Sequence, residues 1–199
     1  LWAGGFVPVI SPVSGGPSGE AVNVNADEAA QWIARQMGAE TLVFLSDVDG
    51  VLTDGSIWYD NQGVELKGFN IRDGLGIKLW QRAGFKFGVL TARTSHIVKL
   101  RAVELGIDIV RQGFEDKLPV AKDILRERGL SPEQVCYIGD ELTDLPVIRF
   151  VGLGVAVGDA AEEVRAAAAH TTGLSGGHGA VRELVETVRK NVTIDWTIR

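Results

Sequence analysis

The feature that most constrains the fold is an alternation of short apolar runs with helical patterns, which begins at residue 41. The apolar runs cover residues 41–46, 85–90, 107–110, 134–138 and 152–157. Helical patterns lie between and after them, at residues 74–83, 95–105, 119–128, 145–150, 160–168 and 179–191. Such an alternation is typical of βαβ units. The sequence therefore predicts an α/β fold with a doubly wound parallel sheet of five strands, whose carboxyl ends form the ligand-binding edge.

Two regions interrupt this alternation. Residues 56–69, SIWYDNQGVELKGF, contain two β-prone pieces around the turn-forming residues 60–63, which predicts a β-hairpin directly after the first strand. Residues 1–40 contain a strand-like apolar piece, a loop rich in Gly, Pro and Ser, and a helical pattern at 26–37. We therefore expect a main domain at residues 41–199 and an N-terminal extension before it.

Charge and composition narrow the class of partner. The net charge is -6 and no basic cluster is longer than a dipeptide, so the electrostatic footprint of a nucleic-acid binder is missing. No apolar run approaches the roughly 20 residues of a membrane span. The single cysteine, Cys136, lies in an apolar run and is expected to be a buried thiol. These observations predict a cytoplasmic protein that binds neither nucleic acid nor a membrane.

Concentrated acidic charge follows the first predicted strand. Asp47, Asp49 and Asp54 fall within the segment DVDGVLTDG, directly after an apolar run. Unpaired charges at a strand end are costly, and a divalent cation relieves the cost. Magnesium characteristically takes one or two carboxylates together with water and substrate phosphate. A solvated acidic turn is the alternative explanation of this segment taken alone.

Three other strand ends carry polar groups suited to phosphate or metal. Thr91 and Arg93 follow the second strand, and both side chains bind phosphate oxygens. Lys117 precedes a helix, and residues 139–144, GDELTD, form a second acidic cluster after the fourth strand. Taken singly, Thr91 is equally explained as a helix cap and Lys117 as a surface lysine. Together, all at one edge of the sheet, they predict a phosphate-binding metal site.

In their order, the segments DVDGV, LTAR, FEDKL and GDELTD resemble the four motifs of the haloacid dehalogenase superfamily, over residues 41–189. The segments ELKGFNIRDG and GGHGAVREL add a closer likeness to phosphatases of 3-deoxy-D-manno-octulosonate 8-phosphate and related keto-sugar phosphates, a reaction of lipopolysaccharide biosynthesis. The resemblance implies a magnesium-dependent hydrolase of a sugar-acid phosphate. The intervals between the motifs leave room for a hairpin but for no large cap domain.

The resemblance also assigns roles to individual residues. Asp47 corresponds to the nucleophile that forms an aspartyl-phosphate, and Asp49 to the general acid and base. Thr91 and Lys117 would hold the phosphoryl oxygens. A non-catalytic binding or oligomerisation module of the same fold is the rival reading, although the complete set of motif residues favours catalysis.

Metal and substrate ligands follow in the same way. Asp47, the backbone carbonyl of Asp49 and Asp140 would bind Mg²⁺, with Asp144 in a supporting role that orients Lys117 or a metal-bound water. A sugar-acid carboxylate calls for cations near the leaving group. The polar residues that we expect there are Arg93, Lys67, Arg72 and Asp73.

Residues 1–52 carry a second resemblance, to the carboxyl half of acetylglutamate kinase and the wider amino-acid kinase family. The glycine-rich phosphate loop and lysines of that family's first half are missing, which disfavours kinase activity. A fusion, a recombined gene, an engineered chimera and a fragment without activity remain open as explanations. The apolar hairpin at residues 56–69 predicts self-association, and the phosphatase resemblance implies a homotetramer.

Overall fold

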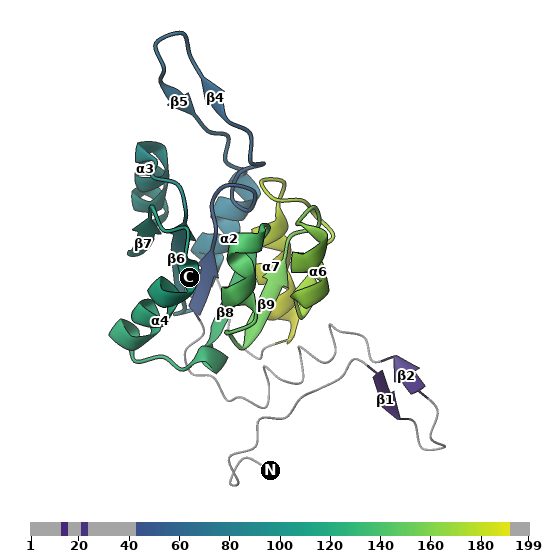
Figure 1. Ribbon diagram of the computed structural model, residues 1–199. Coiled ribbons are helices and arrows are strands. Elements are labelled where there is room, and N and C mark those ends of the chain that lie inside the picture. The colour runs from purple at the N-terminus through teal and green to yellow at the C-terminus, as the bar shows by residue number, and fades with distance from the viewer. Residues whose placement is uncertain (1–12, 16–20, 24–42, 192–199) are drawn as a thin grey trace.

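The computed structural model describes residues 13–15, 21–23 and 43–191 (Figure 1). The first two segments form β1 (Val13–Gly15) and β2 (Ala21–Asn23), which pair antiparallel. The helix expected at residues 26–37 lies outside the described residues. None of the described helices is long and apolar enough to cross a bilayer.

A six-stranded parallel sheet forms the centre of the main domain. Its order is β10-β9-β8-β3-β6-β7, and every neighbouring pair runs parallel. The strands are β3 (Val43–Ser46), β6 (Lys86–Thr91), β7 (Ile109–Gln112), β8 (Val135–Gly139), β9 (Leu153–Ala156) and β10 (His170–Thr171). The strand order reverses at β3, which pairs with both β6 and β8. The predicted doubly wound parallel sheet is confirmed, and β10 is a short edge strand that the sequence did not predict.

Helices cover both faces of the sheet. The first face carries α2 (Ile71–Arg82), α3 (His96–Leu105) and α7 (Ala180–Asn191), with α2 packed against the other two. The second carries α4 (Lys117–Arg128), α5 (Leu145–Ile148) and α6 (Glu162–Ala167), with α5 packed between its neighbours. Right-handed crossovers explain this division, because the chain winds from β3 towards β7 and then returns to β8.

Two helices begin earlier than the sequence pattern predicted. Helix α2 starts at Ile71 because the Asn70 side chain accepts a hydrogen bond from the backbone N–H of Arg72 at 2.8 Å and caps the helix. Helix α4 starts at Lys117, so Pro119 stands in its first turn, where the missing N–H of proline costs no helical hydrogen bond. The earlier start of α4 matters because it makes Lys117 the first residue of the helix. Lys117 is one of the residues that the sequence assigns to the phosphate-binding site.

The core consists of the strands and the apolar faces of the helices. All residues of β3 are buried, as expected for a central parallel strand covered on both faces. Trp80 of α2 packs on Phe44 and Phe85, with ring centroids 4.1 and 4.4 Å apart. Cys136 is a free, buried thiol as predicted, and burial raises its pKa well above the ordinary value.

The predicted hairpin is present and projects from the domain (Figure 1). Its paired part is short, comprising β4 (Trp58–Tyr59) and β5 (Glu65–Leu66). The side chain of Asp60 closes the turn, because its Oδ1 accepts from the N–H groups of Gln62 and Val64 at 2.8 Å each. Large apolar side chains of the hairpin remain more than half exposed: Ile57, Trp58, Tyr59, Val64 and Leu66.

Candidate active site

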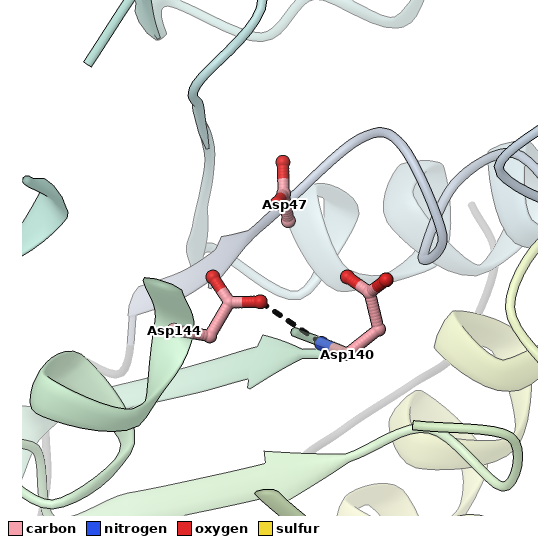
Figure 2. Close-up of side chains that lie close together, drawn as sticks. All are labelled: Asp47, Asp140 and Asp144. Carbon is pink, nitrogen blue, oxygen red and sulfur yellow. Dashed lines mark hydrogen bonds between the residues drawn. The ribbon is translucent and has the colours of Figure 1, made fainter. Parts of the chain in front are cut away.

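Asp47 is the first residue after β3, at the point where the strand order reverses (Figure 2). Its N–H continues the sheet pattern by donating to the carbonyl of Ile138 at 3.2 Å. The side chain is almost fully buried, and its Oδ1 accepts from the N–H of Val48 at 2.6 Å. Its Oδ2 accepts from Nζ of Lys117. The carboxylate is thereby fixed at the ligand-binding edge of the sheet.

Lys117 is buried and lies between two carboxylates. Its Nζ donates to Asp47 and, at 2.6 Å, to Oδ1 of Asp144. Burial alone would lower the pKa of Lys117, but the two carboxylates outweigh burial and raise it above the ordinary value. Lys117 is therefore a permanent positive charge beside Asp47, as a phosphate-binding lysine must be.

Asp144 is fully buried, and each of its carboxylate oxygens accepts two hydrogen bonds. Its Oδ1 accepts from Lys117 and also from the hydroxyl of Tyr137 at 2.5 Å. Its Oδ2 accepts from the N–H groups of Asp140 at 2.9 Å and Glu141 at 3.1 Å, the first of which is drawn in Figure 2. Asp144 therefore lies against Lys117, the residue that the sequence analysis expects it to orient. The sequence reading did not single out Tyr137, whose buried hydroxyl in a central strand was the only available signal.

Asp47, Asp140 and Asp144 place carboxylate oxygens within 4.8 Å of one another. Asp140 nevertheless differs from Asp144 in its hydrogen-bond partners. Oδ1 of Asp140 is buried and accepts no hydrogen bond from the described residues. Burial, followed by the carboxylates of Asp144 and Asp47, raises the pKa of Asp140 to about 8. Asp140 is half-buried, and a carboxylate with one buried oxygen that accepts no bond from the described residues, beside a second carboxylate, fits a hard divalent cation. Each oxygen of Asp144 accepts two hydrogen bonds from protein donors, whereas each oxygen of Asp47 accepts one. Asp47 and Asp140 therefore keep lone pairs that could bind Mg²⁺.

A glycine loop closes over the segment that follows Asp47. Gly50 adopts a positive φ of 84°, and a Cβ there would overlap the Asp140 carboxylate. A Cβ on Gly176 would overlap the carbonyl of Gly50, and the N–H of Gly177 donates to the carbonyl of Val51 at 2.7 Å. The GGHG segment therefore packs directly on the acidic loop.

Asp49 lies in a network of charges at the mouth of the site. Its Oδ1 accepts from Nζ of Lys67, whose side chain is only 1% exposed. Its Oδ2 accepts no hydrogen bond from the described residues and lies 3.5 Å from Nε of Arg93. Glu65 completes the network, with Oε1 at 3.4 Å from Lys67 and 3.2 Å from Arg93. Lys67 and Arg93 thus lie together beside Asp49, whereas the sequence reading missed Glu65.

Thr91, at the end of β6, is buried, and its carbonyl accepts from the N–H of Gly113 at 3.0 Å. That bond ties the end of β6 to the loop before α4.

Arg72 and Asp73, the two other residues expected near the substrate, have different surroundings from Lys67 and Arg93. Arg72 is exposed in the first turn of α2. Asp73 is buried and caps α7, because its oxygens accept from the N–H groups of Gly179 at 3.1 Å and Arg182 at 2.8 Å. Both carboxylate oxygens of Asp73 are thus engaged at the start of α7, and its place near the sugar acid stays a prediction.

Fold and site together define an enzyme class. Where the strand order of the parallel sheet reverses, the carboxylate of Asp47 accepts a hydrogen bond from the buried Lys117. A second carboxylate, that of Asp140, lies nearby and is suited to a divalent cation. This arrangement is typical of α/β enzymes that transfer a phosphoryl group to an aspartate. Residues 92–184 match the model of the haloacid dehalogenase-like hydrolases. Residues 1–71 match the model of the amino acid kinase family, in agreement with the second resemblance.

The chain belongs to the haloacid dehalogenase-like hydrolases. It is 42% identical over 153 residues to 3-deoxy-D-manno-octulosonate 8-phosphate phosphatase KdsC of Yersinia pestis, covering 77% of this chain and 82% of that one. The KdsC phosphatase of Escherichia coli K12 is 41% identical over 158 residues, covering 79% and 83%. The 3-deoxy-D-manno-octulosonate 8-phosphate phosphatase of Moraxella catarrhalis, solved with magnesium, phosphate and KDO, has a TM-score of 0.75 and 38% identity, covering 78% and 90%. The chain is a phosphatase, and Mg²⁺ is its cofactor.

Proposed function

We propose that the chain hydrolyses 3-deoxy-D-manno-octulosonate 8-phosphate (KDO 8-phosphate), or a closely related keto-sugar-acid phosphate, through an aspartyl-phosphate on Asp47. The observation that carries this proposal is the buried contact between Asp47 and Lys117 beside Oδ1 of Asp140, which accepts no hydrogen bond from the described residues. The named activity of relatives about 42% identical to this chain supports the substrate.

In the proposed reaction, one oxygen of Asp47 attacks phosphorus in line with the sugar oxygen. The bond between phosphorus and the sugar oxygen breaks, while Asp49 donates a proton to the sugar oxygen, which leaves as an alcohol. Asp49 then takes a proton from the water that hydrolyses the aspartyl-phosphate. General acid and base assistance of this kind contributes roughly 10² to 10⁴ in rate. The position of Asp49 two residues after the nucleophile, at the mouth of the site, suits this role.

Charge on the phosphoryl group needs a matching set of cations and donors. Lys117 supplies a fixed positive charge, because Asp144 holds its Nζ at 2.6 Å. Thr91 would donate its hydroxyl to a phosphoryl oxygen. Asp47, Asp140 and the backbone carbonyl of Asp49 would hold Mg²⁺, which when bound would supply further neutralisation of the phosphoryl charge. Each of these groups counters repulsion between two anions.

The sugar-acid carboxylate is the second anion of the proposed substrate. Arg93 and Lys67 lie together beside Asp49, where the leaving group would be. Arg93 is the better candidate for direct contact, because its side chain is 37% exposed whereas that of Lys67 is 1% exposed. Arg72 is assigned no contact, because it lies exposed at the start of α2.

We further propose a homotetramer in which neighbouring hairpins cover one another and help to close the sites. The exposed side chains of Trp58 and Leu66 support association, since a two-stranded ribbon buries little apolar surface by itself. A cytoplasmic location remains a prediction from the sequence.

Residues 1–40 are proposed to be a peripheral extension of the phosphatase domain at 41–199. Each catalytic group named above lies between Asp47 and Asp144. We expect removal of residues 1–40 to leave the specific activity within about a factor of two, since distant, independent parts contribute additively. The measurement is phosphate release by the shortened chain, with circular dichroism to verify folding. A folded but inactive product would contradict this boundary.

The central experiment measures inorganic phosphate release from a panel of sugar phosphates with Mg²⁺ and then with excess chelator. The proposal expects the highest kcat/KM for KDO 8-phosphate, and loss of turnover with the chelator that added Mg²⁺ restores. Phosphate release from neutral sugar phosphates alone would exclude the sugar-acid substrate. Binding without release from any substrate would support the non-catalytic reading of the fold.

A further inference from the structure

The part of the hairpin that contacts the main domain, called the hairpin base below, includes Glu65. It makes a set of contacts that the proposed reaction does not explain. Tyr59 of β4 and Glu65 of β5 are direct cross-strand partners. Oε1 of Glu65 accepts from Arg93 at 3.2 Å. Interaction with Tyr59, followed by the charges of Asp49 and Glu65, raises the pKa of the Arg93 guanidinium. The hairpin therefore contacts the β6–α3 loop at Arg93.

A second contact joins Glu65 to the start of α3. Ser95 is the N-cap residue of that helix, a position where a serine side chain usually accepts from the helix's own N–H groups. Here no such cap bond forms, and the Ser95 hydroxyl instead donates to Oε2 of Glu65 at 2.6 Å. Ser95 is buried, so its bond to Glu65 is shielded from water. The two oxygens of Glu65 thus hold the residues on either side of Thr94.

Arg93 is held by these contacts but is still available to a ligand. Its ties run from Nε towards Asp49 and from one terminal nitrogen to Glu65. A guanidinium has five N–H donors, so donors remain for a planar anion. The side chain is 37% exposed, whereas the Glu65 side chain is 19% exposed. An arginine fixed through some donors and open through others is prepared to bind a carboxylate.

Glu65 also balances charge at the mouth of the site. Lys67 and Arg93 face two carboxylates there, those of Asp49 and Glu65. Without Glu65, both cations would have Asp49 as their remaining carboxylate in this network. Arg93 would then lose its charged tie to the hairpin and its fixed place beside the leaving-group side of the site.

We propose that Glu65 is a positioning residue that holds Arg93 for the carboxylate of a sugar-acid phosphate, so that the hairpin of the same chain contributes to substrate specificity. This inference rests on the proposed function and deepens it, because it concerns recognition of the leaving group and not phosphoryl transfer. It assigns the hairpin base a task separate from any association through the exposed apolar side chains.

The test compares Glu65→Ala and Glu65→Gln with the wild-type chain on two substrates. KDO 8-phosphate carries the carboxylate, and p-nitrophenyl phosphate does not. For Glu65→Ala we expect KM for KDO 8-phosphate to rise by about tenfold more than KM for p-nitrophenyl phosphate, the loss typical of one charge-assisted contact. Glu65→Gln should recover part of the loss, because its amide oxygen can still accept from Arg93, while the Ser95 hydroxyl can rotate to accept from the amide N–H group.

Binding of free KDO gives a readout that does not depend on turnover. Its Kd, measured by calorimetry with Mg²⁺ and inorganic phosphate, should weaken in Glu65→Ala in parallel with KM. The matched control is Glu104→Ala, which removes an exposed carboxylate paired with Arg101 on α3 and should leave both substrates unaffected. Folding of every variant is checked by its thermal unfolding midpoint.

The outcomes separate the two proposals. An active wild type whose Glu65→Ala variant loses both substrates equally, or loses neither, overturns the positioning role and leaves the proposed function intact. A folded wild type that hydrolyses p-nitrophenyl phosphate but no carboxylate-bearing sugar phosphate overturns the proposed function and this inference with it. A selective rise in KM, with partial rescue by glutamine, supports the inference.

Discussion

The two ends of the active site are built in different ways. The phosphate end lies on the strand ends of the sheet, where Asp47, Lys117 and Asp144 are buried and bonded to one another. The leaving-group end lies between the hairpin base and the β6–α3 loop, where Glu65 and Arg93 are partly exposed. The first is fixed by the core, and the second by a few polar contacts between short segments.

The contrast shows where this fold permits variation. A change at the phosphate end leaves a buried charge without a partner, which is among the most costly substitutions in a protein. A change at the hairpin base alters exposed or half-exposed ion pairs, whose individual contributions are small. We therefore expect substitutions at the phosphate end to affect chemistry and folding together, and those at the hairpin base to affect recognition alone.

The largest expected effect is that of Asp47→Asn. The amide keeps the shape of the side chain but cannot form the aspartyl-phosphate, so kcat should fall by at least roughly 10⁴-fold, the range seen on removal of a nucleophile. Steady-state phosphate release measures the loss, and circular dichroism verifies the fold. A residual rate of one tenth of wild type would exclude covalent catalysis through Asp47.

The second effect in size concerns Mg²⁺ and pH. The pKa of Asp140 is raised to about 8 in the metal-free protein, and a proton on that carboxyl competes with the cation. Apparent Mg²⁺ affinity should therefore weaken as pH falls, by about fiftyfold between pH 8 and pH 6 for one competing proton. Calorimetric titrations with Mg²⁺ across this range measure the change, and proton release on binding should be greatest below pH 8.

The free energy of unfolding provides a matching control. It should fall as pH rises, whereas Mg²⁺ affinity should fall as pH falls. Because the folded pKa of Asp140 lies above the unfolded value of 3.8, this group destabilises the metal-free fold as pH rises from about 4 to about 8. Added Mg²⁺ should remove that loss, and Asp140→Asn should remove it without Mg²⁺. A Mg²⁺ affinity that is equal at pH 6 and pH 8 would contradict the assignment of Asp140 as a ligand.

The same contrast explains what the sequence could predict. Residues such as Asp47 and Lys117 were identified because parallel strands bring their ends to one edge, which fixes these positions along the chain. The role of Tyr137 was missed because a tyrosine in a buried strand looks like a packing residue until its hydroxyl is placed on Asp144. The contact of Asp73 with α7 could not be predicted, because a carboxylate at the start of one helix gives no sign that it caps another. Such contacts depend on packing between distant segments.

The third effect tests the association expected of the hairpin. Trp58 and Leu66 are cross-strand partners with exposed fractions of 64% and 54%. The double variant Trp58→Asp, Leu66→Asp places two charges on that surface, so light scattering should show smaller assemblies. Activity on KDO 8-phosphate should fall by roughly tenfold if a neighbour helps to exclude water from each site. A monomer as active as the wild type would refute the shared site and leave the chemistry at the strand ends untouched.

The smallest effect is expected from Tyr137→Phe, which tests how strongly the phosphate end depends on its buried network. The variant removes only the hydroxyl that donates to Asp144 at 2.5 Å, while Lys117 and two backbone N–H groups still hold that carboxylate. Loss of one hydrogen bond to a buried charged group should lower the free energy of unfolding by about 1.5 to 3 kcal/mol. Because Asp144 positions Lys117, kcat should fall only a few-fold, with KM for Mg²⁺ nearly unchanged. Chemical denaturation and steady-state kinetics on the same preparation measure both quantities. Unchanged stability together with unchanged kcat would mean that the network at the strand ends tolerates loss of a donor, and the proposed distinction between a fixed phosphate end and an adaptable hairpin base would fail.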